Sequence, residues 1–175
     1  FSDLIIDLPK RALKLRKILC FALQTHKLVE LLALCPDLTL LSTYRQSLDI
    51  TQPAILHSLH KLRTLYHTGN SNLISSITQN NLRQLQCTTI HQLDNFTNLR
   101  KLILNNLPYN VVQENPSFFA PLICLENLNV HIEDIIETES NLKLDLPQSL
   151  RRLFIGSSYY GESREIILEL TPTLV

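Results

Sequence analysis

Histidine and cysteine are the residues of this chain that could ligate a metal ion or act as nucleophiles, but their spacing favours neither role. His57 and His60 are three residues apart and could share a helix face. No nearby cysteine or carboxylate completes a ligand set with them, so no metal site is predicted. The four cysteines are widely separated, without a Cys-x-x-Cys pair, which favours reduced and buried thiols. The three glycines form no phosphate-binding loop. We therefore predict no enzyme and no cofactor.

Arginine offers a different chemistry, because it recurs at a regular spacing. Arg63, Arg83 and Arg100 each follow a leucine in the same local pattern. A guanidinium group pairs with a carboxylate or a phosphate through two parallel hydrogen bonds, so such a series could bind an acidic or phosphorylated partner. The plainer alternative is that these arginines only keep an exposed strand soluble. Which alternative holds depends on the elements that position them.

The three arginines belong to a repeated phrase, Leu-x-x-Leu-x-apolar. Its first leucines recur every 17–26 residues, and they are Leu38, Leu62, Leu82, Leu99, Leu125 and Leu150. Side chains alternate along a strand, so the fourth and sixth positions of the phrase share one face. A single strand and its return segment cannot bury that face, so the repeats must stack into a parallel sheet with a continuous core. Phe1, Leu4 and Ile6 read as an earlier phrase, and Leu174 begins a last one.

The segments between the phrases are predicted to return the chain, partly as helices. Residues 52–62 and 71–80 have apolar side chains at helical spacing. Three prolines within 106–122 leave room for a short helix at most. The shortest interval, between the third and fourth phrases, leaves room for a bare turn. Residues 8–35 read as two helices or one bent helix, and 132–136 as an extra helical turn.

These phrases resemble those of the leucine-rich repeat superfamily over nearly the whole chain. Only Asn70 stands at the asparagine position of the common pattern, so the resemblance is to an irregular type. Cys35-Pro36-Asp37-Leu38 resembles the entry to strands in the repeat domains of F-box proteins. The run LPQSLRRL over 146–153 is similar to a phrase of bacterial effector and amoebal repeats.

The resemblance implies an α/β solenoid of about six to eight repeats, with a curved parallel sheet and helical or irregular return segments. We expect a strand and a helical segment over residues 1–37, as an enlarged first repeat. Residues 38–175 would hold the irregular repeats, as part of a larger solenoid. His67 falls at a core position of its phrase and is predicted to be a buried imidazole with a hydrogen-bond partner.

In such a solenoid the second, third and fifth positions of each phrase would line a concave face that binds the partner. The predicted partner-binding residues are Arg63, Tyr66, Arg83, Gln86, Arg100, Lys101, Ile103, Arg151, Arg152 and Phe154. A second candidate is a basic helix that carries Lys10, Arg11, Lys14 and Lys17. The alternative for this helix is a solvated surface without a ligand.

These features predict a protein–protein interaction module with an acidic or phosphorylated protein partner. The likeness to F-box proteins implies substrate recognition for a ubiquitin ligase. The alternative is a scaffold subunit of a nucleic-acid-associated assembly that contacts phosphate through its basic residues. The formal net charge of zero disfavours a general nucleic-acid binder, which usually carries a basic excess.

The cellular location of the protein is predicted from features that the sequence lacks. No apolar run reaches the ~20 residues that cross a bilayer, so no membrane partner is expected. Acidic residues near the start do not suit a signal peptide, and with the separated cysteines this predicts an intracellular location, cytoplasm or nucleus. Open ends of a solenoid expose unpaired strand edges, so we expect flanking repeats or self-association to cover them.

Overall fold

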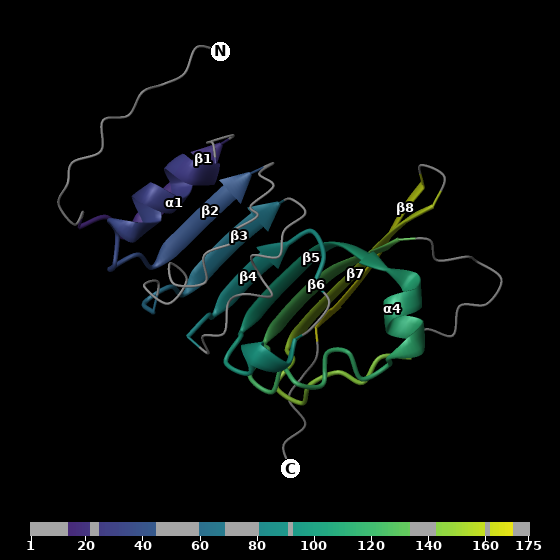
Figure 1. Ribbon diagram of the computed structural model, residues 1–175. Helices are drawn as coiled ribbons and strands as arrows, with labels where there is room; N and C mark the ends of the chain where they lie inside the picture. Colours follow the sequence, from purple (N-terminus) through teal and green to yellow (C-terminus); the bar gives the residue numbers. More distant parts are fainter. Residues whose placement is uncertain are drawn as a thin grey trace.

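The structure is a computed structural model that describes residues 14–21, 25–44, 60–68, 81–90, 93–133, 143–159 and 162–169. One eight-stranded sheet organises this part of the chain, and its strands follow one another in chain order from β1 to β8 (Figure 1). Strands β1 to β7 are all parallel to their neighbours, and β8 pairs antiparallel with β7. The chain therefore has an α/β fold with a single sheet.

The strands lengthen along the sheet. They are β1 Lys17–Phe21, β2 Leu40–Tyr44, β3 Thr64–Thr68, β4 Gln84–Cys87, β5 Lys101–Pro108, β6 Asn127–Glu133, β7 Arg152–Tyr159 and β8 Glu162–Glu169. The described helices are α1 Thr25–Ala33, the short 3-10 helix η1 Asp94–Phe96, and α4 Tyr109–Glu114.

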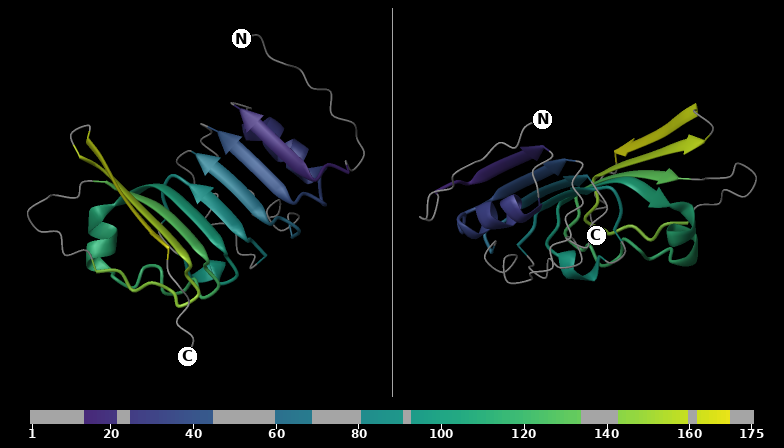
Figure 2. Two further views of the ribbon diagram at one scale, coloured as in Figure 1. Left: turned by 180° about the vertical axis from the view of Figure 1, so that it is seen from behind. Right: turned by 45° about the horizontal axis from the view of Figure 1, so that its top comes forward.

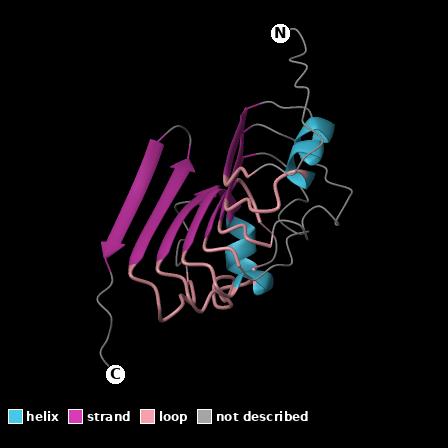
Figure 3. Ribbon diagram, turned by 90° about the vertical axis from the view of Figure 1, so that its left-hand side faces the viewer, coloured by secondary structure: helices cyan, strands magenta, loops and turns pink. Residues whose placement is uncertain are grey.

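Both α-helices lie on one side of the sheet, together with the connecting loops (Figures 2 and 3). In the described ranges, no helix covers the opposite side. We call that side the open face. A parallel strand needs a crossover connection, and here the described crossovers return along the same side each time.

The predicted phrase is confirmed strand by strand. The leucines at its fourth position are Cα partners on successive strands, from Leu41 through Leu65, Leu85, Leu102 and Leu128 to Leu153. Each of them is buried, as the alternation of side chains requires. The six first leucines are buried as well. The repeat therefore builds one continuous core beneath the sheet.

A column of backbone hydrogen bonds fixes the register where the strands begin. The carbonyl of Arg63 accepts the N–H of Arg83 at 2.8 Å and that of Gln84 at 3.0 Å, on the next strand. The carbonyls of Arg83 and Arg100 each accept two such bonds in the same way. The column runs along the second position of every phrase, and its members are Arg16, Thr39, Arg63, Arg83, Arg100, Glu126 and Arg151.

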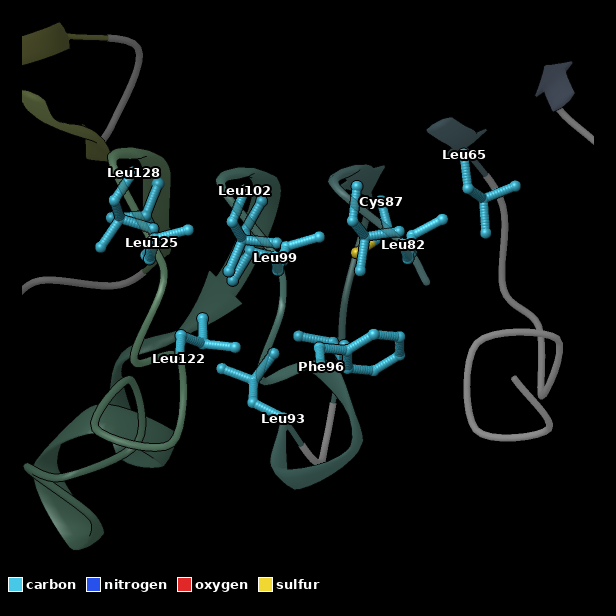
Figure 4. Packing of buried hydrophobic residues seen from close by; sticks show 14 of the residues in the cluster. Leu65, Leu82, Cys87, Leu93, Phe96, Leu99, Leu102, Leu122, Leu125 and Leu128 are labelled. Carbon is cyan, nitrogen blue, oxygen red and sulfur yellow. The ribbon is translucent and has the colours of Figure 1, made fainter. Parts of the chain in front are cut away.

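The return segments close the core from below. Figure 4 shows Leu93, Phe96 and Leu122 from these segments opposite the leucines that enter and occupy the strands. Phe119 is also completely buried. Burying a side chain of this size contributes about 1.5–3 kcal/mol, so these segments stabilise the sheet as well as connect it.

The return segments agree with the sequence where the structure describes them. The short helix expected within 106–122 is α4, which begins directly after Pro108. The shortest interval holds a single 3-10 turn, η1, with Phe96 buried. The helices expected over 52–62 and 71–80 lie outside the described residues, apart from 60–62, which form the turn into β3.

The helix predicted over 8–35 is wrong for its central part. Among the described residues of this range, 14–16 have no regular structure, 17–21 form β1, and only α1 is helical. Leu19 is 67% exposed, whereas Ile18 and Cys20 are buried, as the alternation of a strand requires. Pairing with β2 overrides the local helical spacing, since β1 forms a full parallel ladder with its neighbour. Leu15-x-x-Ile18-x-Cys20 is thus an unrecognised phrase.

The structure differs from the sequence prediction at two further strands, β6 and β8. Ile132 and Glu133, expected in a helical turn, belong to β6, and 134–136 lie outside the described residues. The antiparallel strand β8 had no signal in the repeat. The proposed phrases at Phe1 and Leu174 lie outside the described residues. In the described part of the chain, no helix is long and apolar enough to cross a membrane.

Candidate functional site

Basic side chains gather along the edge of the sheet where the parallel strands begin. The second and third positions of the seven phrases, counting the phrase of β1, hold eight of the chain's 16 lysines and arginines. All eight are exposed. We call this set the basic rim, and its members are Arg16, Lys17, Arg63, Arg83, Arg100, Lys101, Arg151 and Arg152. Neighbouring strands lie ~4.8 Å apart, so the rim is about 29 Å long.

Few of these charges are neutralised within the described part of the protein. Arg83 Nη1 donates to the carbonyl of Asn98 at 3.1 Å, in the turn that enters the next strand. Arg100 Nη1 forms an ion pair with Glu126 Oε1 at 3.1 Å. Glu126 is the one acidic residue at the second and third positions of the described phrases. Since each guanidinium has five N–H donors, Arg83 and Arg100 keep donors for a ligand.

The third position of each phrase is the first residue of its strand, so Lys17, Lys101 and Arg152 share the open face with the fifth position. On each strand the fifth position lies two residues further on, and this row carries no charge from β1 to β7. We call it the fifth-position row, and its members are Leu19, Ser42, Tyr66, Gln86, Ile103, Asn129 and Phe154. A line of positive charge therefore borders a neutral surface of mixed polarity.

Hydrogen bonding on this face leaves one acceptor unused. Tyr66 Oη donates to Gln84 Oε1 at 3.3 Å, which orients the phenol along the sheet. Asn129 Oδ1 is buried and has no hydrogen-bond partner within the described part. It lies in register between Ile103 and Phe154. A buried acceptor without a partner is costly.

An aromatic pair adjoins that acceptor. The rings of His131 and Phe154 lie 5.5 Å apart at an interplanar angle of 51°. Gly156 is the register partner of His131, and a Cβ on it would stand 2.5 Å from His131 Nδ1. Glycine at this point lets the imidazole lie close against β7. His131 and Asn129 were not among the predicted site residues, although Asn129 stands at the fifth position, the signal that selected Tyr66, Gln86, Ile103 and Phe154. His131 stands at the seventh position, which was not assigned to the face.

All ten predicted partner-binding residues fall on two neighbouring rows of one sheet. Six belong to the basic rim, and the other four, Tyr66, Gln86, Ile103 and Phe154, belong to the fifth-position row. The sequence interpretation missed Arg16 because its segment was read as a helix. The signal that could have found it is the phrase that starts at Leu15.

Two of the four residues predicted on a basic helix, Lys14 and Lys17, are not helical. Lys14 precedes β1 and Lys17 is its first residue, so neither lies on a helix. Lys17 joins the basic rim instead. Lys10 and Arg11 lie outside the described residues. Residues 17–21 form a strand and not the predicted helix, because they pair in register with β2, with Lys17 beside Leu40.

The buried thiols and the buried imidazole of the core are unreactive groups. Burial raises the pKa of the Cys87 thiol to about 12, so it stays protonated at neutral pH and is a poor nucleophile. Burial also raises the pKa values of Cys20 and Cys35. His67 is completely buried, and its Nδ1 lies 2.7 Å from Thr43 Oγ1 in a hydrogen bond, which confirms the predicted buried imidazole.

No group of three or more histidine, cysteine, aspartate or glutamate side chains in the described ranges could hold a metal ion. His57 and His60 were considered from the sequence as a pair of metal ligands. His57 lies outside those ranges, and His60 lies in the turn before β3.

The fold and the site together define an α/β protein whose single sheet has a charged edge and one open face. Comparisons with protein-family models, curated proteins and solved structures found no match to this chain. The geometry of the basic rim and the fifth-position row is therefore the basis for a functional proposal.

Proposed function

We propose that this chain is an irregular leucine-rich repeat solenoid that serves as a protein–protein interaction module. The repeated phrases, their common register and the return of the chain along one side support this assignment. The side of such a sheet that faces away from the core is a broad surface available for binding. In this proposal the partner of the chain binds to the open face.

The composition of the fifth-position row carries the proposal. Tyr66, Ile103 and Phe154 are partly exposed and supply aromatic and aliphatic anchors. Gln86 and Asn129 add amide groups. Anchors of this kind, surrounded by polar groups, are the usual centre of a protein interface. The row would form the centre and the basic rim one border.

Within this class, the proposed role is substrate recognition for an F-box-type ubiquitin ligase at an intracellular location. The support is the run Cys35-Pro36-Asp37-Leu38 at the entry to β2, where Cys35 and Leu38 are buried. This narrower role rests on the likeness of that run to F-box repeat domains. Co-purification of a cullin-type ligase would support it.

The test is quantitative affinity capture from a cell extract with three proteins. The wild-type chain is compared with a Tyr66→Ala/Ile103→Ala/Phe154→Ala variant and with Ile123→Ala. Ile123 is 67% exposed on a connecting loop, so it is a matched apolar control away from the row. We expect the partners to drop by at least about tenfold in the triple variant and to persist in the control. Equal capture by all three proteins, with unchanged circular dichroism, would refute the open face as the binding site.

A second candidate function is a scaffold subunit in a nucleic-acid-associated assembly. The basic rim favours it, since arginine and lysine side chains bind phosphate. The net charge of zero and the uncharged fifth-position row count against it. A steep loss of binding with rising salt would distinguish this candidate, because phosphate contacts release counterions.

A further inference from the structure

We propose that the basic rim binds an acidic segment of the partner protein, laid as an extended chain across the starts of the seven parallel strands. This inference rests on the proposed function, because the segment belongs to the protein held on the open face. It adds a second binding element with its own chemistry, one that recognises consecutive carboxylates.

The distribution of charge is the first argument. The chain carries 16 basic and 16 acidic residues, so its overall field is weak. Half of the basic residues nevertheless stand at fourteen positions along one edge, with Glu126 as the sole acid among those positions. Neighbouring like charges repel one another, and a row of carboxylates would relieve that repulsion. The rim therefore has a locally positive potential, which a row of carboxylates would neutralise.

The type of basic residue is the second argument. Six of the eight rim residues are arginine, whereas lysine supplies two. The planar guanidinium group binds a carboxylate through two hydrogen bonds, and this geometry selects anions more sharply than an ammonium group does. Arg63 and Arg151 form no ion pair in the described part, and Arg83 uses one donor on a backbone carbonyl.

The shape of the rim is the third argument. It is a narrow strip that runs about 29 Å from β1 to β7, interrupted at β2, which has Thr39 and Leu40, and at β6, which has Glu126. An extended peptide of about nine residues spans the same length. The neighbouring fifth-position row carries no charge, so a second line of anions would find no counterpart there. Duplex nucleic acid presents two phosphate strands and would need a wider basic surface. A single acidic polypeptide segment fits the strip better.

The test measures binding of labelled peptides by fluorescence anisotropy. The probe is an oligoglutamate of about nine residues. An oligoglutamine of equal length and an oligouridylate of equal charge serve as comparison ligands. We expect the wild-type chain to bind oligoglutamate, to ignore oligoglutamine, and to bind oligouridylate more weakly. Weaker binding of oligoglutamate than of oligouridylate, or none at all, would overturn the proposal.

Charge-reversal variants locate the binding site. Arg63→Glu/Arg83→Glu should weaken oligoglutamate binding by at least about tenfold. Lys27→Glu/Lys143→Glu makes the same change in net charge outside the rim, and it should have a much smaller effect. An equal loss in both variants would mean that only net charge matters and would refute the rim as a site. Circular dichroism checks that each variant folds.

The same set of proteins separates this inference from the proposed function. The Tyr66→Ala/Ile103→Ala/Phe154→Ala variant keeps the whole rim, so it should bind oligoglutamate as the wild type does. If that variant loses captured partners and oligoglutamate fails to bind the wild type, the open face stands and the rim proposal falls. If oligoglutamate binds but capture is unaffected by the triple variant, the reverse holds.

Discussion

The two ends of the sheet are built differently. Strands β1 to β4 have four or five residues, whereas β5 to β7 have seven or eight. Around β5 and β6, α4 and the loop after it bring Val112 and Phe119 under the sheet. The added length of these two strands includes the pair Leu107 and Ile132, both buried. These features extend the core at the β5 and β6 end of the sheet.

The β1 end has shorter strands and exposed apolar side chains on its open face, although α1 contributes the completely buried Leu28 and Leu32 on the other side. Leu19 and Phe21 are 67% and 74% exposed, and the ring of Phe21 contacts only that of Tyr44 among the described aromatic pairs. The side chains at the sixth position of the phrase also differ between the two ends of the sheet. It holds Thr43 and His67 on β2 and β3, where the other end holds Leu104 and Val130 on β5 and β6. The short end is therefore held by a polar contact as well as by apolar packing.

The largest expected effect lies at the long end. Phe119→Ala removes a completely buried ring that contacts Phe118 edge-on at 5.1 Å, and it should lower the free energy of unfolding by about 3–5 kcal/mol. Phe21→Ala is the matched change at the short end and should alter it by less than about 0.5 kcal/mol. Urea denaturation measures both. Similar losses in the two variants would contradict the contrast between the ends.

An intermediate effect is expected from the polar contact at the short end. Thr43→Val keeps the shape of the side chain but removes the hydroxyl that hydrogen-bonds His67 Nδ1. The loss should be about 1–3 kcal/mol, because the imidazole nitrogen stays buried. Thr43→Ser retains a hydroxyl and serves as the control for hydrogen bonding. Thermal unfolding that ranks Thr43→Ser no better than Thr43→Val would exclude a role for the hydrogen bond.

The smallest effect concerns the turns that lead into β2 and β3. Lys61 donates a hydrogen bond to Asp37, and this pairing holds the pKa of the Asp37 carboxyl below its usual value. A carboxyl with a lowered pKa stabilises the fold above its unfolded pKa, and that contribution is lost as the pH falls through the folded pKa. In Lys61→Ala the Asp37 pKa should rise toward its ordinary value, as an NMR titration would detect. An unchanged pKa would show that Lys61 is not the cause.

The sequence predicted the sheet through its six regular phrases, because each leucine position answers to burial at a fixed place on a strand. It failed for β1, where Ile18 and Cys20 are too few to outweigh a helical spacing that also fits. It also failed for β8, whose antiparallel pairing depends on a neighbour and leaves no period in the sequence. Such elements are decided by tertiary pairing, which a local pattern does not record.

The candidate site was predicted residue by residue but not in its layout. The second position of the phrase precedes the strand, so the alternation of strand side chains does not govern Arg63, Arg83, Arg100 and Arg151. Arg83 donates to the backbone carbonyl of Asn98 in the turn before β5, whereas Arg152 is the first residue of β7.

The paired backbone bonds at the strand starts have a consequence for how such a protein can change over evolutionary time. The carbonyl that accepts both bonds belongs to threonine, arginine or glutamate with equal ease, as Thr39, Arg63 and Glu126 show. The alignment of one repeat on the next thus does not depend on which side chain stands there. Mutation can rewrite these positions one at a time, so related chains could share this framework while diverging in the partners they select.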